Sequence, residues 1–145
     1  MSDIKKVSIQ LNTTIDNGDD KETYELLTTG KLQNIGDTLY LRYDEVQQDL
    51  EKVHTILKWA PKEAFIMRSG IVKMRQKFVK ELMTVGSYES PYGTMQMLTT
   101  TQKMDHSWDE GLKEGKMVLH YHLNMNGNDV GQYTMEICYK EENSK

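Results

Sequence analysis

The sequence predicts an all-β protein, a single up-and-down antiparallel β-barrel of about 8–10 strands. Three observations favour this fold. Apolar and polar residues alternate with a period of two along most of the chain. Short turn signals separate the alternating runs, and no amphipathic segment has the length and spacing of a helix. Closure into a barrel removes the exposed edges of such a sheet, although alternation alone leaves a two-sheet sandwich open.

Length and composition indicate one folded domain over residues 1–145. Hydrophobic residues make up 37% of the chain and charged residues 28%, which excludes wholesale disorder. The net charge of −4 argues against general nucleic-acid binding and against an anionic membrane surface. Cys138 is the only cysteine, so no internal disulfide can form. Without an apolar leader or spanning segment, the sequence predicts a cytoplasmic location.

Alternation predicts the first four strands between residues 7 and 59. The first carries its apolar residues on one face, and the second contains Gly30, which marks a bulge or a sharp coil. The polar segment 44–51 is expected to be a loop or one helical turn. Pro61 ends the fourth strand. The four strands are expected over residues 7–15, 22–33, 39–43 and 53–59.

Residues 65–79 predict a β-hairpin, the fifth and sixth strands, around a tight turn at Ser69 and Gly70. If these two residues form the whole loop, Phe65 lies opposite Met74 and Met67 opposite Val72, so that the apolar faces coincide. The outer face then carries a basic stripe. The favoured interpretation is a solvated surface, and the alternative is a binding surface for an acidic partner or RNA. The stripe consists of Arg68, Lys73, Arg75 and Lys77.

Four further strands complete the predicted barrel. Pro91 and Gly93 mark a turn between the seventh and eighth strands. The charged segment 105–115 is expected to be a loop. Placing Met125 opposite Tyr133 aligns the apolar residues of the last two strands on one face. These four strands are expected over residues 85–90, 95–104, 117–125 and 133–139.

Two segments of the chain are distinctive in their combination of residues. The first is 67–74 (MRSGIVKM) with Gln76, Phe78 and Val79 behind it; the second is 88–93 (YESPYG), which precedes a threonine-rich strand. With these segments the chain resembles the YwiB-like family of small bacterial proteins. The resemblance extends from about residue 23 to about residue 101. It implies a calycin-like, lipocalin-type barrel, and it brings no catalytic residues that could be transferred to this chain.

A barrel of this size either fills itself with side chains or holds one small ligand. The favoured hypothesis is a non-catalytic binder of a small apolar or amphipathic molecule. The alternative is a filled barrel that acts through its outer surface, as an interaction module or a homodimer. The residues predicted to line the interior are Tyr43, Phe65, Met67, Met74, Phe78, Tyr121 and Tyr139.

No motif in the sequence predicts catalysis, a cofactor or a metal. The chain has no nucleophile elbow, glycine-rich phosphate loop or paired C-x-x-C. In the register chosen above, His122 lies opposite Glu136 and His120 opposite Cys138, which together could ligate zinc. Because this face is the polar, outer one, two solvated histidines are the simpler interpretation.

Overall fold

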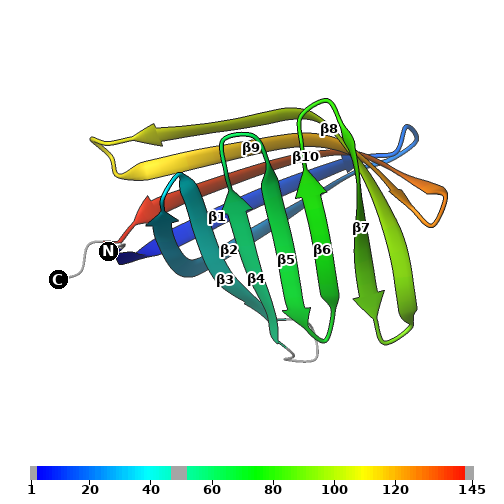
Figure 1. The fold of residues 1–145 in the computed structure, drawn as a ribbon, viewed down its shortest axis with the longest axis horizontal. Helices are drawn as coiled ribbons and strands as arrows, with labels where there is room; N and C mark the ends of the chain where they lie inside the picture. Colours follow the sequence, from blue (N-terminus) through cyan, green and yellow to red (C-terminus); the bar gives the residue numbers. More distant parts are fainter. Residues whose placement is uncertain (1–2, 47–51, 143–145) are drawn as a thin grey trace.

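The protein is a closed barrel of ten antiparallel strands, seen in a computed structural model that describes residues 3–46 and 52–142 (Figure 1). Each strand pairs with the next one in the chain, and β10 pairs with β1, which confirms the predicted up-and-down barrel. The strands are β1 (Ile4–Asp16), β2 (Lys21–Ile35), β3 (Thr38–Val46), β4 (Lys52–Trp59), β5 (Ala64–Gly70), β6 (Lys73–Phe78), β7 (Met83–Ser90), β8 (Gly93–Asp109), β9 (Glu114–Met125) and β10 (Asn128–Glu141).

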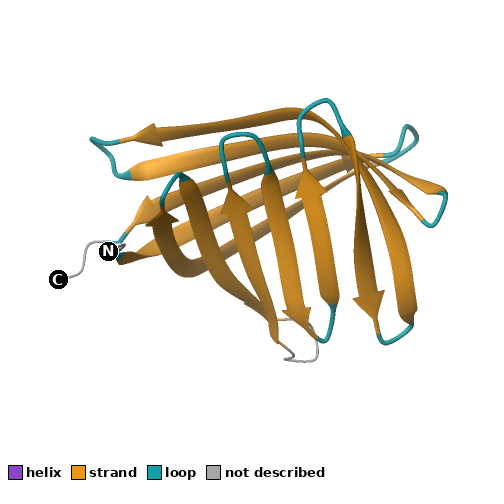
Figure 2. Cartoon of the chain, in the orientation of Figure 1, coloured by secondary structure: helices purple, strands orange, loops and turns teal. Residues whose placement is uncertain are grey.

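Long and short strands form two different walls of the barrel. The long strands β1, β2, β8, β9 and β10 run across the view of Figure 1, and the shorter strands β3–β7 cross in front of them. In the described part of the chain, short turns join the strands and there is no helix (Figure 2). In particular, this part holds no helix with the length and apolar character that crossing a bilayer requires. The interior therefore lies between two layers of strands.

The core consists of the inward side chains of nearly every strand, as alternation requires in a closed sheet. In β4 the buried residues are Val53, Thr55, Leu57 and Trp59, with more exposed residues between them. In β9 they are Met117, Leu119, Tyr121 and Leu123. For these strands the predicted inner faces agree with the burial in the structure.

The predicted register of the β5–β6 hairpin is wrong. Phe65 pairs with Lys77 instead of Met74, a shift of three residues, and Arg68 pairs with Met74. A shift by an odd number turns one strand over. Ala64, Ile66 and Arg68 therefore face inward on β5, whereas Phe65 and Met67 face outward.

Pairing with β4 decides the orientation of β5. Leu57 faces the core and pairs with Ile66, so Ile66 must face the core as well. Gly70 is not the tip of a two-residue turn but the last residue of β5, paired with Val53 at a φ of 127°. A Cβ at Gly70 would lie 2.4 Å from the carbonyl oxygen of Lys52, so only glycine fits this approach.

Three further expectations differ from the structure. The segment 105–115 is not a loop, because β8 continues to Asp109 and β9 begins at Glu114. A register shift between Thr101 and Lys103 moves the inward-facing residues from odd to even positions. The alternation of apolar and polar residues is therefore interrupted, and the sequence pattern does not reveal that the strand continues. Tyr133 pairs with Tyr121, not Met125. β3 continues to Val46, and residues 47–51 of the expected polar loop lie outside the described residues.

Candidate functional site

The interior of the barrel contains a cavity of about 670 Å³ that is open to solvent, and all ten strands contribute side chains to it. Most of its lining is apolar or aromatic. Five methionines and five tyrosines account for much of the wall, and aliphatic side chains from β1, β2, β5 and β9 add to it. The methionines are Met74, Met95, Met97, Met125 and Met135, and the tyrosines are Tyr24, Tyr43, Tyr88, Tyr121 and Tyr133.

A charged pair lies in the wall of this cavity. Arg68 on β5 donates a hydrogen bond from Nη2 to Oε2 of Glu45 on β3, at 2.6 Å. The two side chains are only 22% and 21% exposed. They meet across β4, where Val53 pairs with Glu45 and Thr55 pairs with Arg68. Such a pair, largely removed from water, supplies both a strong donor and a strong acceptor.

The polar atoms around this pair are incompletely satisfied. Nε of Arg68 and Oγ1 of Thr55 are buried and have no hydrogen-bond partner in the described part of the chain. Each such atom costs free energy on folding, on the order of 1–3 kcal/mol. Burial raises the pKa of Tyr43, and the negative charge of Glu45 raises it further. The Tyr43 hydroxyl therefore stays neutral and can both donate and accept.

Aromatic rings and an amide group form another part of the interior around the cavity. The rings of Tyr121 and Tyr133 stack with centroids 4.9 Å apart, and Phe78 meets Tyr121 edge-on, also at 4.9 Å. Nε2 of Gln76 donates to Oγ1 of Thr99 at 3.1 Å, which joins β6 to β8. Burial raises the pKa of Tyr121, so this hydroxyl is neutral as well.

The structure separates the seven residues predicted to line the interior. Tyr43, Met74 and Tyr121 line the cavity. Phe78 is completely buried behind Tyr121, and Tyr139 lies toward the other end of the barrel. Phe65 and Met67 lie on the outer face, which corrects their predicted inward placement.

The basic stripe is also divided. Lys73, Arg75 and Lys77 lie on the outer face of β6, and Lys77 Nζ is 3.2 Å from Glu63. Arg68 instead faces the cavity, so its prediction as an outer residue is wrong. The spacing of Arg68 from Ala64 and Ile66 could not have revealed this, because Phe65 and Met67 give the other side of β5 an equally apolar pattern.

The other end of the barrel holds an aromatic cluster around Tyr139. Its hydroxyl is 2.6 Å from Nε2 of His106, and its ring stacks with those of His106 and Trp108. The ring of Tyr139 covers Gly115, where a Cβ would lie 2.3 Å from it. These residues border a cleft of about 570 Å³ whose rim carries Lys5, Lys113, Glu110 and Glu141.

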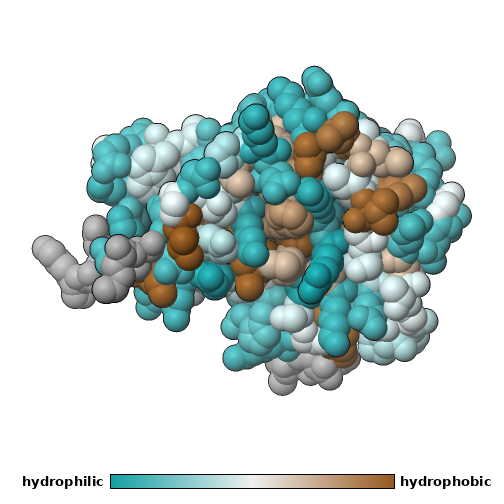
Figure 3. Space-filling model, in the orientation of Figure 1, coloured by the Kyte–Doolittle hydropathy of each residue, from teal (hydrophilic) through white to brown (hydrophobic). Residues whose placement is uncertain are grey.

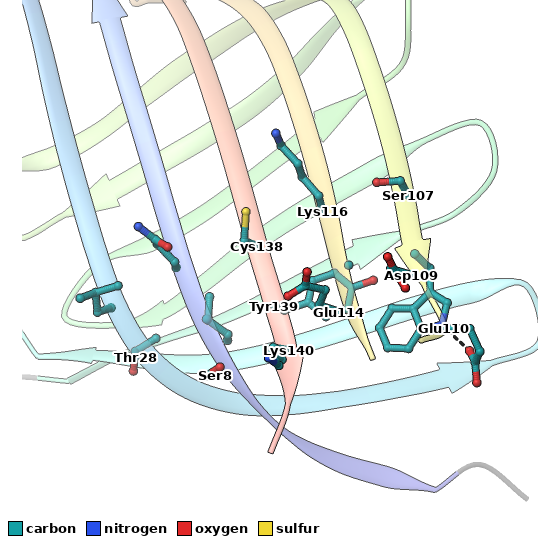
Figure 4. Close-up of a pocket in the computed structure, with 15 residues that line it drawn as sticks. Ser8, Thr28, Ser107, Asp109, Glu110, Glu114, Lys116, Cys138, Tyr139 and Lys140 are labelled. Carbon is teal, nitrogen blue, oxygen red and sulfur yellow. Dashed lines mark hydrogen bonds between the residues drawn. The ribbon is translucent and has the colours of Figure 1, made fainter. Parts of the chain in front are cut away.

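A wider groove of about 900 Å³ runs over this end of the sheet (Figure 4). Cys138 lies in it, opposite Gln10 and Lys116 and not His120 as predicted. Lys116 is already paired with Glu136 at 2.8 Å. His122 lies opposite Gln132 and contacts Asp129 at 2.6 Å. Within the described residues, no three His, Cys, Asp or Glu side chains are grouped to hold a metal ion.

Acidification is expected to destabilise the fold through His106. Partial shielding from solvent, beside Tyr139, lowers the pKa of this histidine below its ordinary value of 6.5, so the unfolded chain binds the proton more tightly. Stability is therefore lost as the pH falls through 6.5. Urea unfolding at about pH 7.5 and about pH 5 should show a larger loss for the wild type than for His106→Gln. Equal losses in the two proteins would contradict this assignment.

Comparisons with known proteins agree on one family. The family model described as "Domain of unknown function (DUF1934)" matches residues 9–137. The chain is 30% identical over 134 residues to the "Uncharacterized beta-barrel protein YwiB" of Bacillus subtilis (strain 168), covering 92% of each chain. It also superposes on the crystal structure of ywiB protein from Bacillus subtilis with a TM-score of 0.84 at 28% identity, covering 97% of this chain and 94% of that one.

Proposed function

The chain belongs to the DUF1934 family, and from the cavity inside its barrel we propose that it binds a small amphipathic molecule without transforming it. The observation that carries this proposal is an interior that side chains leave open. Ligand pockets commonly measure about 300–1,000 Å³, and the cavity of about 670 Å³ falls within that range. A barrel serving only as a scaffold would pack the same space with side chains.

The chemistry of the wall suits an amphipathic ligand. Methionine side chains are flexible and polarisable, so they adapt to apolar groups of different shape. Tyrosine rings add flat apolar area with a hydroxyl at one end. The Arg68–Glu45 pair provides the few well-placed polar groups that orient a bound molecule.

Binding without chemistry is proposed because of the polar groups in the described lining. Tyr43 and Tyr121 are held neutral, and the guanidinium of Arg68 is charge-paired with the carboxylate of Glu45. A nucleophile needs an adjacent base within hydrogen-bond distance. Tyr24 of the lining donates its hydroxyl to Glu22 at 2.5 Å, but this pair is exposed, so orientation is the role proposed for the polar groups inside the barrel.

The alternative function, a filled barrel that acts through its outer surface, has less support. Such a protein would need a packed interior, and the cavity therefore favours the binding proposal over it. On the face that Figure 3 shows, hydrophobic surface is divided into separate patches by hydrophilic residues. A protein-binding surface would present a contiguous apolar area instead.

Filling the cavity is expected to abolish binding. Met74→Trp places a bulky ring in the cavity wall, whereas Met67→Trp places the same ring on the outer face of the neighbouring strand. Titration with Nile red, an uncharged apolar fluorophore, should show binding at least about tenfold weaker for Met74→Trp and unchanged for Met67→Trp. Native mass spectrometry of the purified wild type should reveal retained small molecules.

The two variants share one substitution, so a general effect of tryptophan would affect both. Equal affinity of wild type and Met74→Trp for Nile red would place the binding outside the barrel. An absence of binding by the folded wild type, together with only the ligand-free mass, would refute the proposed function.

A further inference from the structure

We propose that the cavity selects an uncharged head group that carries both an N–H donor and a C=O acceptor, such as a carboxamide, through the Arg68–Glu45 pair. This inference rests on the proposed function and names the chemical class of its ligand. Arg68 presents N–H donors to the cavity, and Glu45 beside it presents carboxylate oxygens. An amide is the simplest group that offers the complementary acceptor and donor side by side.

The pair is held in place by the sheet. Glu45 and Arg68 are on strands that flank β4, and their side chains meet over Val53 and Thr55. Val53 is completely buried and Thr55 is 1% exposed, so the two side chains of the pair rest on closely packed residues of β4. Neither charged side chain can leave the other without leaving a charge unpaired in a largely buried place. The donor and acceptor are therefore preorganised at one spot of the wall.

The balance of charge disfavours a charged head group. The described lining contains Arg68, Glu45 and, at the rim, Glu25, whose carboxylate accepts a hydrogen bond from Gln10 Nε2 at 3.1 Å. A ligand carboxylate that reached Arg68 would lie next to Glu45 and would meet like-charge repulsion. An ammonium group that reached Glu45 would likewise meet Arg68. A neutral head group meets neither and keeps the ion pair intact.

An amide gains a hydrogen bond from each member of the pair. Its carbonyl oxygen can accept from the guanidinium, and its N–H can donate to the carboxylate, so that both bonds are charge-assisted. The neutral hydroxyl of Tyr43, whose residue pairs with Thr55 on β4, adds a group that donates or accepts as required. An aliphatic chain behind the head group would then lie against the methionines of the wall.

The test is a series of ligands with one chain and three head groups. Octanamide, octanoate and octylamine are titrated at neutral pH into the wild-type protein by calorimetry, or by displacement of Nile red. Octanamide is expected to bind at least about tenfold more tightly than either charged ligand. Tightest binding of octanoate or octylamine, or equal binding of all three, would overturn the inference.

Two charge-removing variants should invert the preference. Glu45→Gln leaves the guanidinium unpaired, so octanoate should become the tightest ligand. Arg68→Gln leaves the carboxylate unpaired, so octylamine should become the tightest. Glu25→Gln is the matched control, because it removes a rim carboxylate that contacts Gln10 and not Arg68, and it should keep the wild-type order.

The outcomes separate this inference from the proposal beneath it. One outcome is that Nile red binds inside the barrel while the affinity ranking of the three octyl ligands is the same in wild type, Glu45→Gln and Arg68→Gln. In that case the cavity holds ligands without discriminating between their head groups. If neither Nile red nor any octyl ligand binds the wild type, the proposed function itself fails. Where neither variant folds, the ranking on the wild type alone decides the inference.

Discussion

Phe78→Ala is expected to lower the free energy of unfolding by about 3–5 kcal/mol, the usual cost of removing a fully buried aromatic ring. Phe78 is 0% exposed, and its ring meets Tyr121 edge-on at 4.9 Å. Truncation removes this contact and leaves a void in a closed barrel whose walls are bound together by hydrogen bonds. Such walls collapse little onto a void, so the cost should lie toward the upper end.

Phe65→Ala is the matched control, because these are the only two phenylalanines of the chain. Phe65 lies on the outer face, where Lys77 Nζ is 5.4 Å from its ring centroid. Loss of this cation–π contact should cost about 1 kcal/mol or less. Urea unfolding followed by circular dichroism measures both values. Similar losses for the two variants would mean that β5 has the orientation predicted from the sequence and not the one in the structure.

Gly30→Ala is expected to destabilise the barrel by about 1–3 kcal/mol or more, as overpacking does. Gly30 pairs with Val7 on one side and with Tyr43 on the other, so it lies where β2 leaves one wall and joins the next. A Cβ here would lie 2.3 Å from the carbonyl oxygen of Arg42 and 2.7 Å from Cδ1 of Ile9. Backbone cannot rotate away as a side chain can, so the strands must separate.

Backbone entropy alone predicts the opposite sign for the change in stability. Alanine has fewer conformations than glycine in the unfolded chain, so the substitution by itself would stabilise the protein. The control is Gly111→Ala, in the exposed turn between β8 and β9, where the nearest atom is an Asp109 carboxylate oxygen at 3.3 Å. That change should stay within about 0.5 kcal/mol. Thermal melting of both variants checks the contrast. A Gly30→Ala protein as stable as the wild type would show that β2 and β3 are farther apart than in the structure.

The fold could be predicted from the sequence because alternation is a local property. Every predicted strand overlaps an observed one, and the order of pairing follows the chain, as short turns require. The resemblance to the YwiB-like family is also confirmed by the family model and by the B. subtilis barrel. The faces of β4, β6 and β9 agree as well, since only one face of each carries mainly apolar residues.

The candidate site could be predicted only in part. Tyr43, Met74 and Tyr121 lie on strands of unambiguous pattern, and they line the cavity. The run Ala64 to Arg68 is ambiguous, because Phe65 and Met67 are as apolar as Ala64 and Ile66. Alternation therefore selects neither face of β5. The assumed two-residue turn then selected the wrong one.

The sequence by itself determined an antiparallel all-β fold with short connections and favoured a barrel with an aromatic and apolar interior. The tertiary structure decided that Arg68 leaves the outer basic stripe and meets Glu45 inside the barrel. The physical reason is that the face of an ambiguous strand depends on its partners. β4 places Leu57 opposite Ile66 and Thr55 opposite Arg68, and this pairing brings a charge into the cavity.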